Sequence, residues 1–476
     1  MKKPLPENPS AIGGNQRGLG WLVLIVGGAL LVVLIGILLP RPLDRTSNKA
    51  GKGLTNHSQT ALSKGVERST QSVLFERFRV HGNSTTAPTA EEIVADQLGL
   101  IAHNRHEILH KMAEAWNLQV PADFDSFFDM AEAGRWDELQ DLFGTMMTNR
   151  MKGVWSEGAS RLWPAVTQTF GIAEAAHKWP AQRLLDYGAA VLDSLPPETI
   201  YAGGNSAAYY IPTLLDETTD GPQRVTLTQN ALADATYLDY VSFLYGDRLH
   251  SLTHEESQEA FETYLADAKK RLEHDRDFPN EPKQLRPGED IEITEGRVQV
   301  SGQVAVMAIN EKLFQTLMDK NPDSSFAIAQ SFPFESTYAD ATPVGPIMAL
   351  RVSEEKNKLT AARASEAVNY WATTTEQLLA DPAADVPDVR KEYAKMASDQ
   401  AALLLDRNFP AEAEQTLQYA LQISPSSPAI VFRYISLLTD QKRIVEAISA
   451  VDNAAKADPG NEQFRQVLEV LKQQKH

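Results

Sequence analysis

The feature that most constrains this chain is an apolar segment near its N-terminus. Residues Leu19–Leu39 comprise 21 residues without a charged side chain, rich in Leu, Val and Ile. As a helix rising about 1.5 Å per residue, this segment spans roughly 30 Å, the thickness of the hydrocarbon core of a bilayer. Trp21 suits the membrane interface, and Pro40 stops the helix. A cleaved signal peptide is the alternative, but its apolar region is usually only about 7–15 residues long, and no small-residue cleavage site follows here. We therefore expect a single transmembrane helix at 19–39 after an N-terminal tail at 1–18.

Basic residues on the two sides of this segment bear on its orientation. The tail before it holds three Lys or Arg residues, and four follow it between Arg41 and Lys52. This near balance leaves the positive-inside comparison undecided. A short basic tail followed by a large exported domain is the commoner plan. We therefore expect a single-pass protein of the inner (cytoplasmic) membrane, with its body periplasmic or otherwise outside the cytoplasm.

Charge divides the chain into a basic beginning and an acidic body. Residues 1–90 carry 11 Lys and Arg against 4 Asp and Glu, whereas the chain totals of 45 and 63 leave 34 against 59 for residues 91–476. Such an acidic body repels phosphate backbones, so we expect no nucleic-acid partner. Residues 40–88 form a polar, basic tether. Its basic stretch from Arg41 to Arg79 either rests on anionic headgroups or is an ordinary solvated linker. The absence of cysteine excludes disulfides, thiolate zinc sites and a cysteine nucleophile.

Hydrophobic periodicity divides the body into a helical and a mixed part. Thr89 and Glu92 have capping-box spacing at the start of a helical region, 89–195. From 196 to 353, short apolar runs alternate with helical stretches, which predicts crossover units and a mostly parallel sheet. The expected strands are 199–202, 225–228, 291–294, 298–300, 326–329 and 347–352, the third and fourth forming a hairpin through Glu295-Gly296. We thus predict a mainly α protein with a central α/β domain at 196–353 and a connecting helix at 354–389.

The C-terminus contains an internal repeat. Small residues and prolines recur 34 residues apart: Ala413, Ala420 and Pro425 reappear as Ala447, Ala454 and Pro459. This is the period of the tetratricopeptide repeat, in which small residues let paired helices pack closely and proline ends the second helix. Ala401 also fits the first repeat, whereas Ile435 departs from the small residue expected in the second. We predict two repeats and a capping helix within 390–476, leaning on the α/β domain because two repeats are few for a free-standing solenoid.

The segment His106-Glu107-Ile108-Leu109-His110 reads H-E-x-x-H, a pattern that can hold zinc on one helix face. Three observations argue against zinc. Arg105 and Lys111 place charges directly beside the motif, and the helical projection puts His103 and both motif histidines opposite the apolar stripe. No third ligand stands at a recognisable spacing. We therefore expect a solvated polar face and no metal.

A candidate cleft lies where the predicted strands end. Gly203-Gly204 could open an anion site at a helix N-terminus, although a tight strand-to-helix turn explains the pair without a ligand. Because ligands of open α/β sheets bind beyond the carboxyl ends of the strands, three loops are expected to converge there. The candidate cleft residues are Gly203, Gly204, Asn205, Ser206, Gln229, Asn230, Asp234, Gln330 and Ser331. No catalytic residue, metal ligand or cofactor motif is assigned.

Several segments carry a family resemblance. They are Tyr201-Ala202-Gly203-Gly204, the run from Leu227 to Asp234 that contains T-Q-N-A-L-A-D, Thr236-Tyr237-Leu238 and Leu244-Tyr245-Gly246-Asp247. From about residue 89 to 355 the chain resembles uncharacterised bacterial membrane-anchored tetratricopeptide-repeat proteins, a resemblance that implies no established activity. More remotely, it is similar to the soluble tail of O-mannosyltransferase-like membrane proteins, although their catalytic multi-helix membrane portion has no counterpart here.

Two departures from this family affect the cleft. Members tend to read G-G-T-D-P-G where this chain has Gly203-Gly204-Asn205-Ser206-Ala207-Ala208, and E-E-S where it has Ala329-Gln330-Ser331. Both changes remove carboxylates. The sequence therefore favours a membrane-anchored interaction or scaffold protein of the cell envelope with a non-catalytic α/β domain, no cofactor, and a protein partner bound by the repeats. The alternative is an enzyme or sugar-binding module linked to cell-surface glycosylation.

Overall fold

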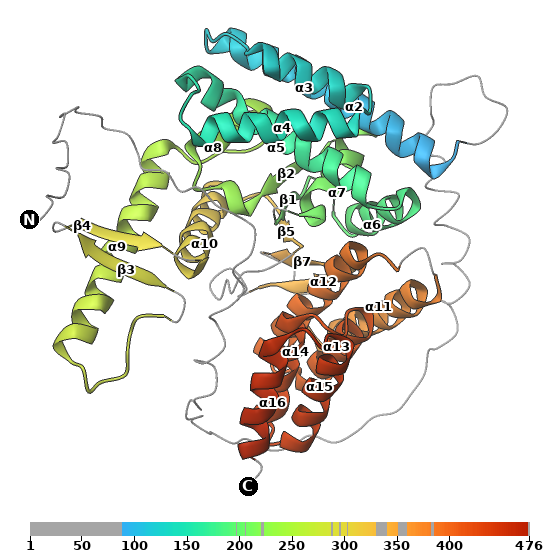
Figure 1. The fold of residues 1–476 in the computed structure, drawn as a ribbon, viewed down its shortest axis with the longest axis vertical. Coiled ribbons are helices and arrows are strands. Elements are labelled where there is room, and N and C mark those ends of the chain that lie inside the picture. Colours follow the sequence, from blue (N-terminus) through green and yellow to red (C-terminus); the bar gives the residue numbers. More distant parts are fainter. Residues whose placement is uncertain are drawn as a thin grey trace, which may run out of the picture.

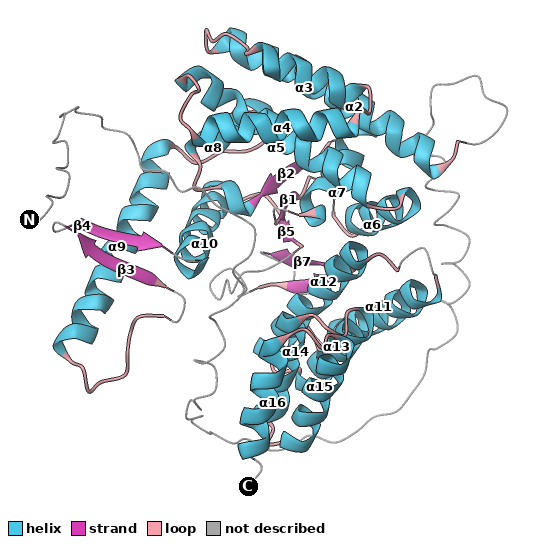
Figure 2. Ribbon diagram, viewed as in Figure 1, coloured by secondary structure: helices cyan, strands magenta, loops and turns pink. Residues whose placement is uncertain are grey.

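The computed structural model describes residues 88–196, 198–204, 206–219, 223–286, 289–294, 297–301, 303–329, 340–350, 359–381 and 385–474. The expected N-terminal tail, transmembrane helix and tether lie outside these residues. Among the helices that are described, none is both long and apolar enough to cross a bilayer. The body is mainly helical and contains a small mixed sheet (Figures 1 and 2).

The secondary structure runs along the chain as follows, with the labels of Figure 1. The helices are α2 Ala90–Ala115, α3 Ala122–Glu132, α4 Trp136–Met151, α5 Glu157–Lys178, α6 Ala181–Asp193, α7 Ala207–Thr218, the 3-10 helix η1 Gln229–Ala231, α8 Ala235–Tyr245, α9 His254–Asp277, α10 Gln303–Lys320, α11 Ala361–Ala380, α12 Pro387–Asp406, α13 Pro410–Ile423, α14 Pro428–Asp440, α15 Ile444–Ala457 and α16 Glu462–Gln474. The strands are β1 Ile200–Gly203, β2 Val225–Thr228, β3 Asp290–Thr294, β4 Arg297–Ser301, β5 Phe326–Ile328, β6 Thr342–Val344 and β7 Ile347–Leu350.

The five-stranded sheet has the order β2-β1-β5-β7-β6. β1 pairs in parallel with β2, after the crossover through α7, and with β5 on its other side. β7 runs antiparallel to β5, and β6 antiparallel to β7, so the expectation of a mostly parallel sheet is corrected to a mixed one. The cause is a tight β6–β7 turn at Gly345-Pro346, where Gly345 has φ +53°. A two-residue turn returns the chain at once, whereas a parallel pair needs a longer crossover.

Helices cover both faces of this sheet. Ile200 and Ala202 of β1 belong to an apolar core shared with α8 and α10, together with helices α2 to α5. Tyr201, between them, points to the other face and joins a second core with α6, α7, α11 and α12. Alternate residues of a strand point to opposite faces, so β1 is buried along its whole length because helices cover both of its faces.

The predicted β3–β4 hairpin is present but forms a separate two-stranded sheet. Its strands pair antiparallel from Asp290 opposite Ser301 to Thr294 opposite Arg297. Figure 2 shows the hairpin beside α9, away from the five-stranded sheet. The hairpin therefore contributes no strand to the central sheet.

The repeat region consists of antiparallel helix pairs from α12 to α16. Its backbone repeats with the sequence: Asn408 and Lys442, 34 residues apart, both have a left-handed φ, +63° and +62°. Ala413, Ala420, Ala447 and Ala454 are all at most 2 % exposed, as the close packing of paired helices requires. The predicted repeat and its small-residue positions are thus confirmed.

α12 rests directly on the sheet. The Gln400 side chain of α12 is fully buried, and its amide nitrogen donates to the backbone oxygens of Gly345 and Ile347 at 2.8 and 2.9 Å. Its side-chain oxygen accepts a hydrogen bond from Trp371 Nε1 at 2.8 Å. These bonds join the repeats to α11 and to the β6–β7 hairpin. The repeats therefore pack on the α/β domain, as we expected because two repeats are few for a free-standing solenoid.

Candidate functional site

The first candidate loop follows β1 and is shaped by a close backbone approach. A Cβ atom on Gly203 would lie 2.7 Å from Tyr209 Cα, so only glycine fits where α7 starts against the strand. Gly204 is buried beside it, and Asn205 lies outside the described residues. The tight strand-to-helix turn that explains the double glycine without a ligand is therefore present.

Ser206 is the N-cap residue of α7, and a carboxylate lies against it. The Ser206 hydroxyl caps the helix by accepting from the backbone N–H of Ala208 at 3.3 Å, and it donates to Glu392 Oε2 at 3.3 Å. Glu392 comes from α12, 186 residues further along the chain, and is 9 % exposed. A helix N-terminus attracts anions, and here the chain supplies the acidic group itself. A carboxylate of the protein therefore lies beside this helix N-terminus, against the capping serine.

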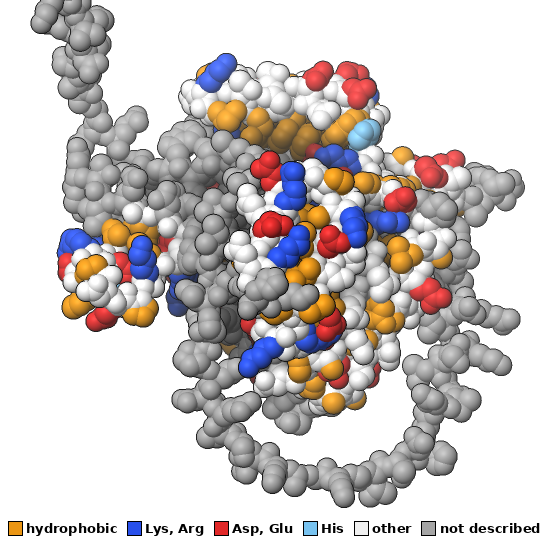
Figure 3. Space-filling view, turned by 60° about the horizontal axis from the view of Figure 1, so that its bottom comes forward, with side chains coloured by type: hydrophobic (Ala, Val, Ile, Leu, Met, Phe, Trp, Pro, Cys, Tyr) orange, Lys and Arg blue, Asp and Glu red, His pale blue; other side chains and the backbone are white. Residues whose placement is uncertain are grey.

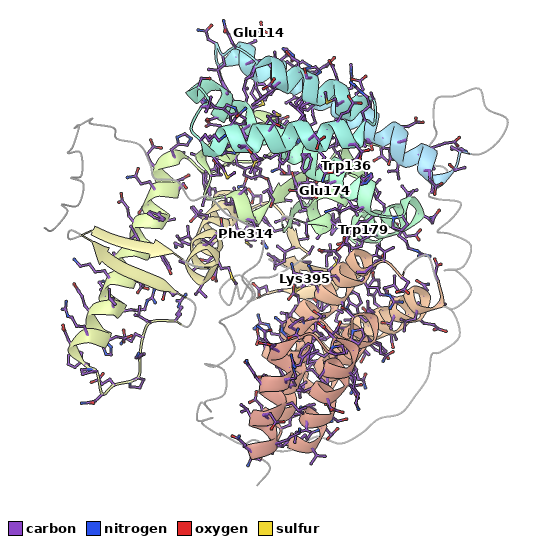
Figure 4. All side chains as sticks on the ribbon, viewed as in Figure 1. Glu114, Trp136, Glu174, Trp179, Phe314 and Lys395 are labelled. Atoms are coloured by element: carbon purple, nitrogen blue, oxygen red, sulfur yellow. The ribbon has the colours of Figure 1, made fainter. Side chains whose placement is uncertain are left out.

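Burial has raised the pKa of Glu392, and the positive charge of Lys395 and the Ser206 hydrogen bond oppose that rise only in part. Figure 4 labels Lys395 on α12, where this helix comes up to the sheet. The group thus has two of the properties of a catalytic acid, namely burial and a raised pKa. It lies between packed helices, however, and makes its hydrogen bond to a capping serine. We assign Glu392 a packing role between α12 and α7.

The second candidate loop follows β2. Asp234 caps α8 by accepting from Thr236 N–H at 2.9 Å, and Gln229 is buried within η1. Asn230 has a buried side-chain oxygen without a hydrogen-bond partner among the described residues. The third loop, with Gln330 and Ser331, lies outside the described residues, so its predicted convergence stays a prediction.

Two buried tyrosines of α8 form hydrogen bonds with β2. The Tyr237 hydroxyl accepts from the Thr228 N–H at 2.8 Å, and the hydroxyls of Tyr245 and Thr226 lie 3.3 Å apart. Burial raises the pKa of Tyr237 and of Tyr245, which keeps both hydroxyls uncharged inside the core. Each tyrosine thus stabilises the strand end.

A buried ion pair that the sequence did not reveal lies nearby. Arg105 of α2 is fully buried and donates from Nε to Glu217 Oε2 of α7 at 2.9 Å, and its guanidinium also contacts the Tyr240 hydroxyl. Burial by itself lowers the pKa of Arg105. Glu217 and the neighbouring tyrosines raise this pKa by more than burial lowers it, so the net value is well above the ordinary one. From the sequence we expected the Arg105 charge to lie beside the histidines of the H-E-x-x-H motif. It points into the core instead, because one residue along a helix turns the side chain by about 100°.

Comparison with known proteins identifies the C-terminal region. Residues 404–471 match the family model described as tetratricopeptide repeat. No curated protein and no solved structure matches the chain. The chain therefore carries tetratricopeptide repeats, a class of helical repeat whose stacked surfaces generally bind other proteins.

Proposed function

We propose that this protein is a single-pass membrane protein of the cell envelope whose repeats bind a protein partner. The observation that carries the proposal is the repeat region itself, which both matches the tetratricopeptide family and is hydrogen-bonded to the sheet through Gln400. This attachment presents the repeat helices to a partner in one fixed orientation, which lowers the entropic cost of binding.

The α/β part supports a scaffold role. Its two described candidate loops use Ser206 and Asp234 as helix caps, and the Ser206 hydroxyl also donates to the buried Glu392 carboxylate. The glycosylation-linked alternative requires a sugar or nucleotide sugar in these loops, where Ser206 and Asp234 already cap helices. Acidic, basic and apolar side chains are interspersed on the face shown in Figure 3.

The repeat region offers an apolar side chain for a partner. Val445, in the first turn of α15, is 62 % exposed. An exposed aliphatic side chain offers apolar contact area to a bound protein, although single ones also occur on surfaces without a partner. We expect Val445→Asp to reduce the amount of partner that co-purifies with the full chain from detergent-solubilised membranes. The fold should persist, because an acidic residue suits the first turn of a helix.

The matched control is Val154→Asp. Val154 is 68 % exposed and lies in the loop between α4 and α5, outside the repeats. Quantitative mass spectrometry of the co-purified proteins should show a protein that is depleted by Val445→Asp and retained by Val154→Asp. Equal recovery of every bound protein with both variants would count against binding through this surface.

The apolar segment at 19–39 supports the anchor, and the large acidic body after a short basic tail supports an extracytoplasmic orientation. We expect a protease added to intact spheroplasts to digest the body, with immunoblotting of a C-terminal tag as the measurement. A variant without residues 19–39 should appear in the soluble fraction. Full protection of the tag until lysis would show that the body lies in the cytoplasm. A full-length chain in the soluble fraction would show that residues 19–39 do not anchor the protein.

A further inference from the structure

Two histidines and an aspartate converge on the outer face of the α2–α3 hairpin. His106 and His110 stand one turn apart on α2, and Asp125 lies in the first turn of α3. Asp125 Oδ1 is 2.9 Å from Nε2 of each histidine, and the two Nε2 atoms are 3.3 Å apart. Among the described residues, these three form a group whose ligand atoms all lie within 4.8 Å of one another.

The packing of the hairpin holds this arrangement. Asn117, with φ +52°, turns the chain after α2, and α3 packs back with Phe124, Phe127 and Phe128 in the core. The His106 ring stacks on Phe128, with centroids 5.1 Å apart and planes 9° apart. The apolar face that joins the two helices thus sets both the orientation of His106 and the position of Asp125.

The three ligand atoms have the separations that a metal ion requires. Zinc binds imidazole nitrogen and carboxylate oxygen at about 2.0–2.2 Å, and tetrahedral geometry then places ligand atoms about 3.3 Å from one another. The observed separations of 2.9, 2.9 and 3.3 Å are close to that value. Two imidazoles with one carboxylate favour zinc and its transition-metal neighbours over Mg²⁺ or Ca²⁺, which prefer oxygen ligands alone.

Two of the three sequence arguments against zinc change with the structure. Arg105 lies in the core and not beside the histidines, and Asp125 supplies the third ligand from the next helix. Glu107, the central glutamate of the motif, is paired with Lys111 at 3.1 Å. The geometry therefore supports metal binding and gives no ground for a protease mechanism.

We propose that His106, His110 and Asp125 bind one Zn²⁺ ion, which joins α2 to α3 and keeps an open coordination position toward solvent. His110 and Asp125 are 53 % and 41 % exposed, and the group opens onto a surface hollow lined by His103, His106, Glu107, His110, Lys111 and Glu114. Glu114, labelled in Figure 4, marks this end of α2 one turn beyond His110. Three protein ligands and one open position leave room for water or a donor group from another molecule.

The test uses the tag-free full chain in detergent, stripped with a chelator and then dialysed against zinc. Elemental analysis should find one zinc per chain, and Co²⁺ in its place should give the visible absorption of a site with four or five ligands. His110→Ala and Asp125→Asn should weaken zinc binding by more than about 10–100-fold, the loss that even an outer-shell partner causes. Zinc should raise the melting temperature of the unmodified chain, and Mg²⁺ should not.

His103→Ala is the matched control, because His103 is 54 % exposed on the same helix and lies outside the group. It should bind zinc as the unmodified chain does. Melting curves of the chelated proteins verify that each variant is folded, and both substituted ligands are surface residues. The proposal is overturned if the unmodified chain retains no zinc, if the ligand variants bind zinc as tightly as it does, or if His103→Ala abolishes binding.

Discussion

Glu217→Ala is expected to lower the free energy of unfolding by about 3–5 kcal/mol, because it leaves the Arg105 guanidinium charged and unpaired in the core. The side chain of Arg105 is 1 % exposed and that of Glu217 is 14 % exposed. Arginine does not lose its proton at accessible pH, so the variant cannot relieve the charge by titration. Urea denaturation of the full chain in detergent, followed by circular dichroism, measures the loss.

Two further variants test whether the loss comes from the unpaired buried charge. Glu174→Ala removes an exposed partner of Lys178 on α5, labelled in Figure 4, and is expected to cost no more than about 0.5 kcal/mol. The double variant Arg105→Met, Glu217→Leu removes both charges and should recover part of the stability that Glu217→Ala loses, since apolar replacements of buried ion pairs are often tolerated. A Glu217→Ala loss as small as that of Glu174→Ala would show that the pair does not stabilise α2 against α7.

Ala420→Leu is expected to destabilise the repeat region by about 1–3 kcal/mol, the usual cost of overpacking a filled core. Ala420 of α13 is 0 % exposed and shares its apolar core with α12 and the sheet. Three extra carbon atoms have no room there, because protein interiors are packed to the density of organic crystals. Hydrogen exchange of α12 to α14 and denaturant unfolding measure the change.

Gln415→Leu serves as the control for Ala420→Leu. Gln415 is exposed on the same helix, and substitutions at such positions change stability by no more than about 0.5 kcal/mol. If Ala420→Leu and Gln415→Leu shift hydrogen exchange equally little, Ala420 does not lie at a close approach of two helices. The assignment of the 34-residue repeat would then lose its structural basis.

Features set by local sequence were predictable. The capping box at the start of α2 is present, with Glu92 accepting from Thr89 N–H at 2.8 Å and Thr89 Oγ1 accepting from Glu92 N–H at 3.2 Å. The alanine repeat, β1 and β2 also lie where their patterns place them. The cap and the strands are decided within one turn or one strand, and the repeat by a 34-residue period, so the pattern of the sequence is sufficient in each case.

Features set by distant parts of the chain were not predictable. Glu392 reaches Ser206 across 186 residues, and no pattern near either residue indicates the other. Asp125 meets the two histidines only because α3 folds back onto α2, and the burial of Arg105 depends on Glu217 in another helix. The antiparallel β6–β7 hairpin is an exception, because the dipeptide Gly345-Pro346 is a local turn signal that predicts a mixed sheet.

The central claim is that the repeats bind a protein partner, and photo-crosslinking in intact membranes tests it most directly. A photoreactive amino acid replaces Val445 on the repeats in one sample and Val154 outside them in another. Both positions are exposed, at 62 % and 68 %, so reactivity toward solvent and lipid is matched. The proposed function predicts a discrete adduct of higher mass from position 445 and none from position 154. No adduct from 445, or the same adduct from both positions, would contradict it.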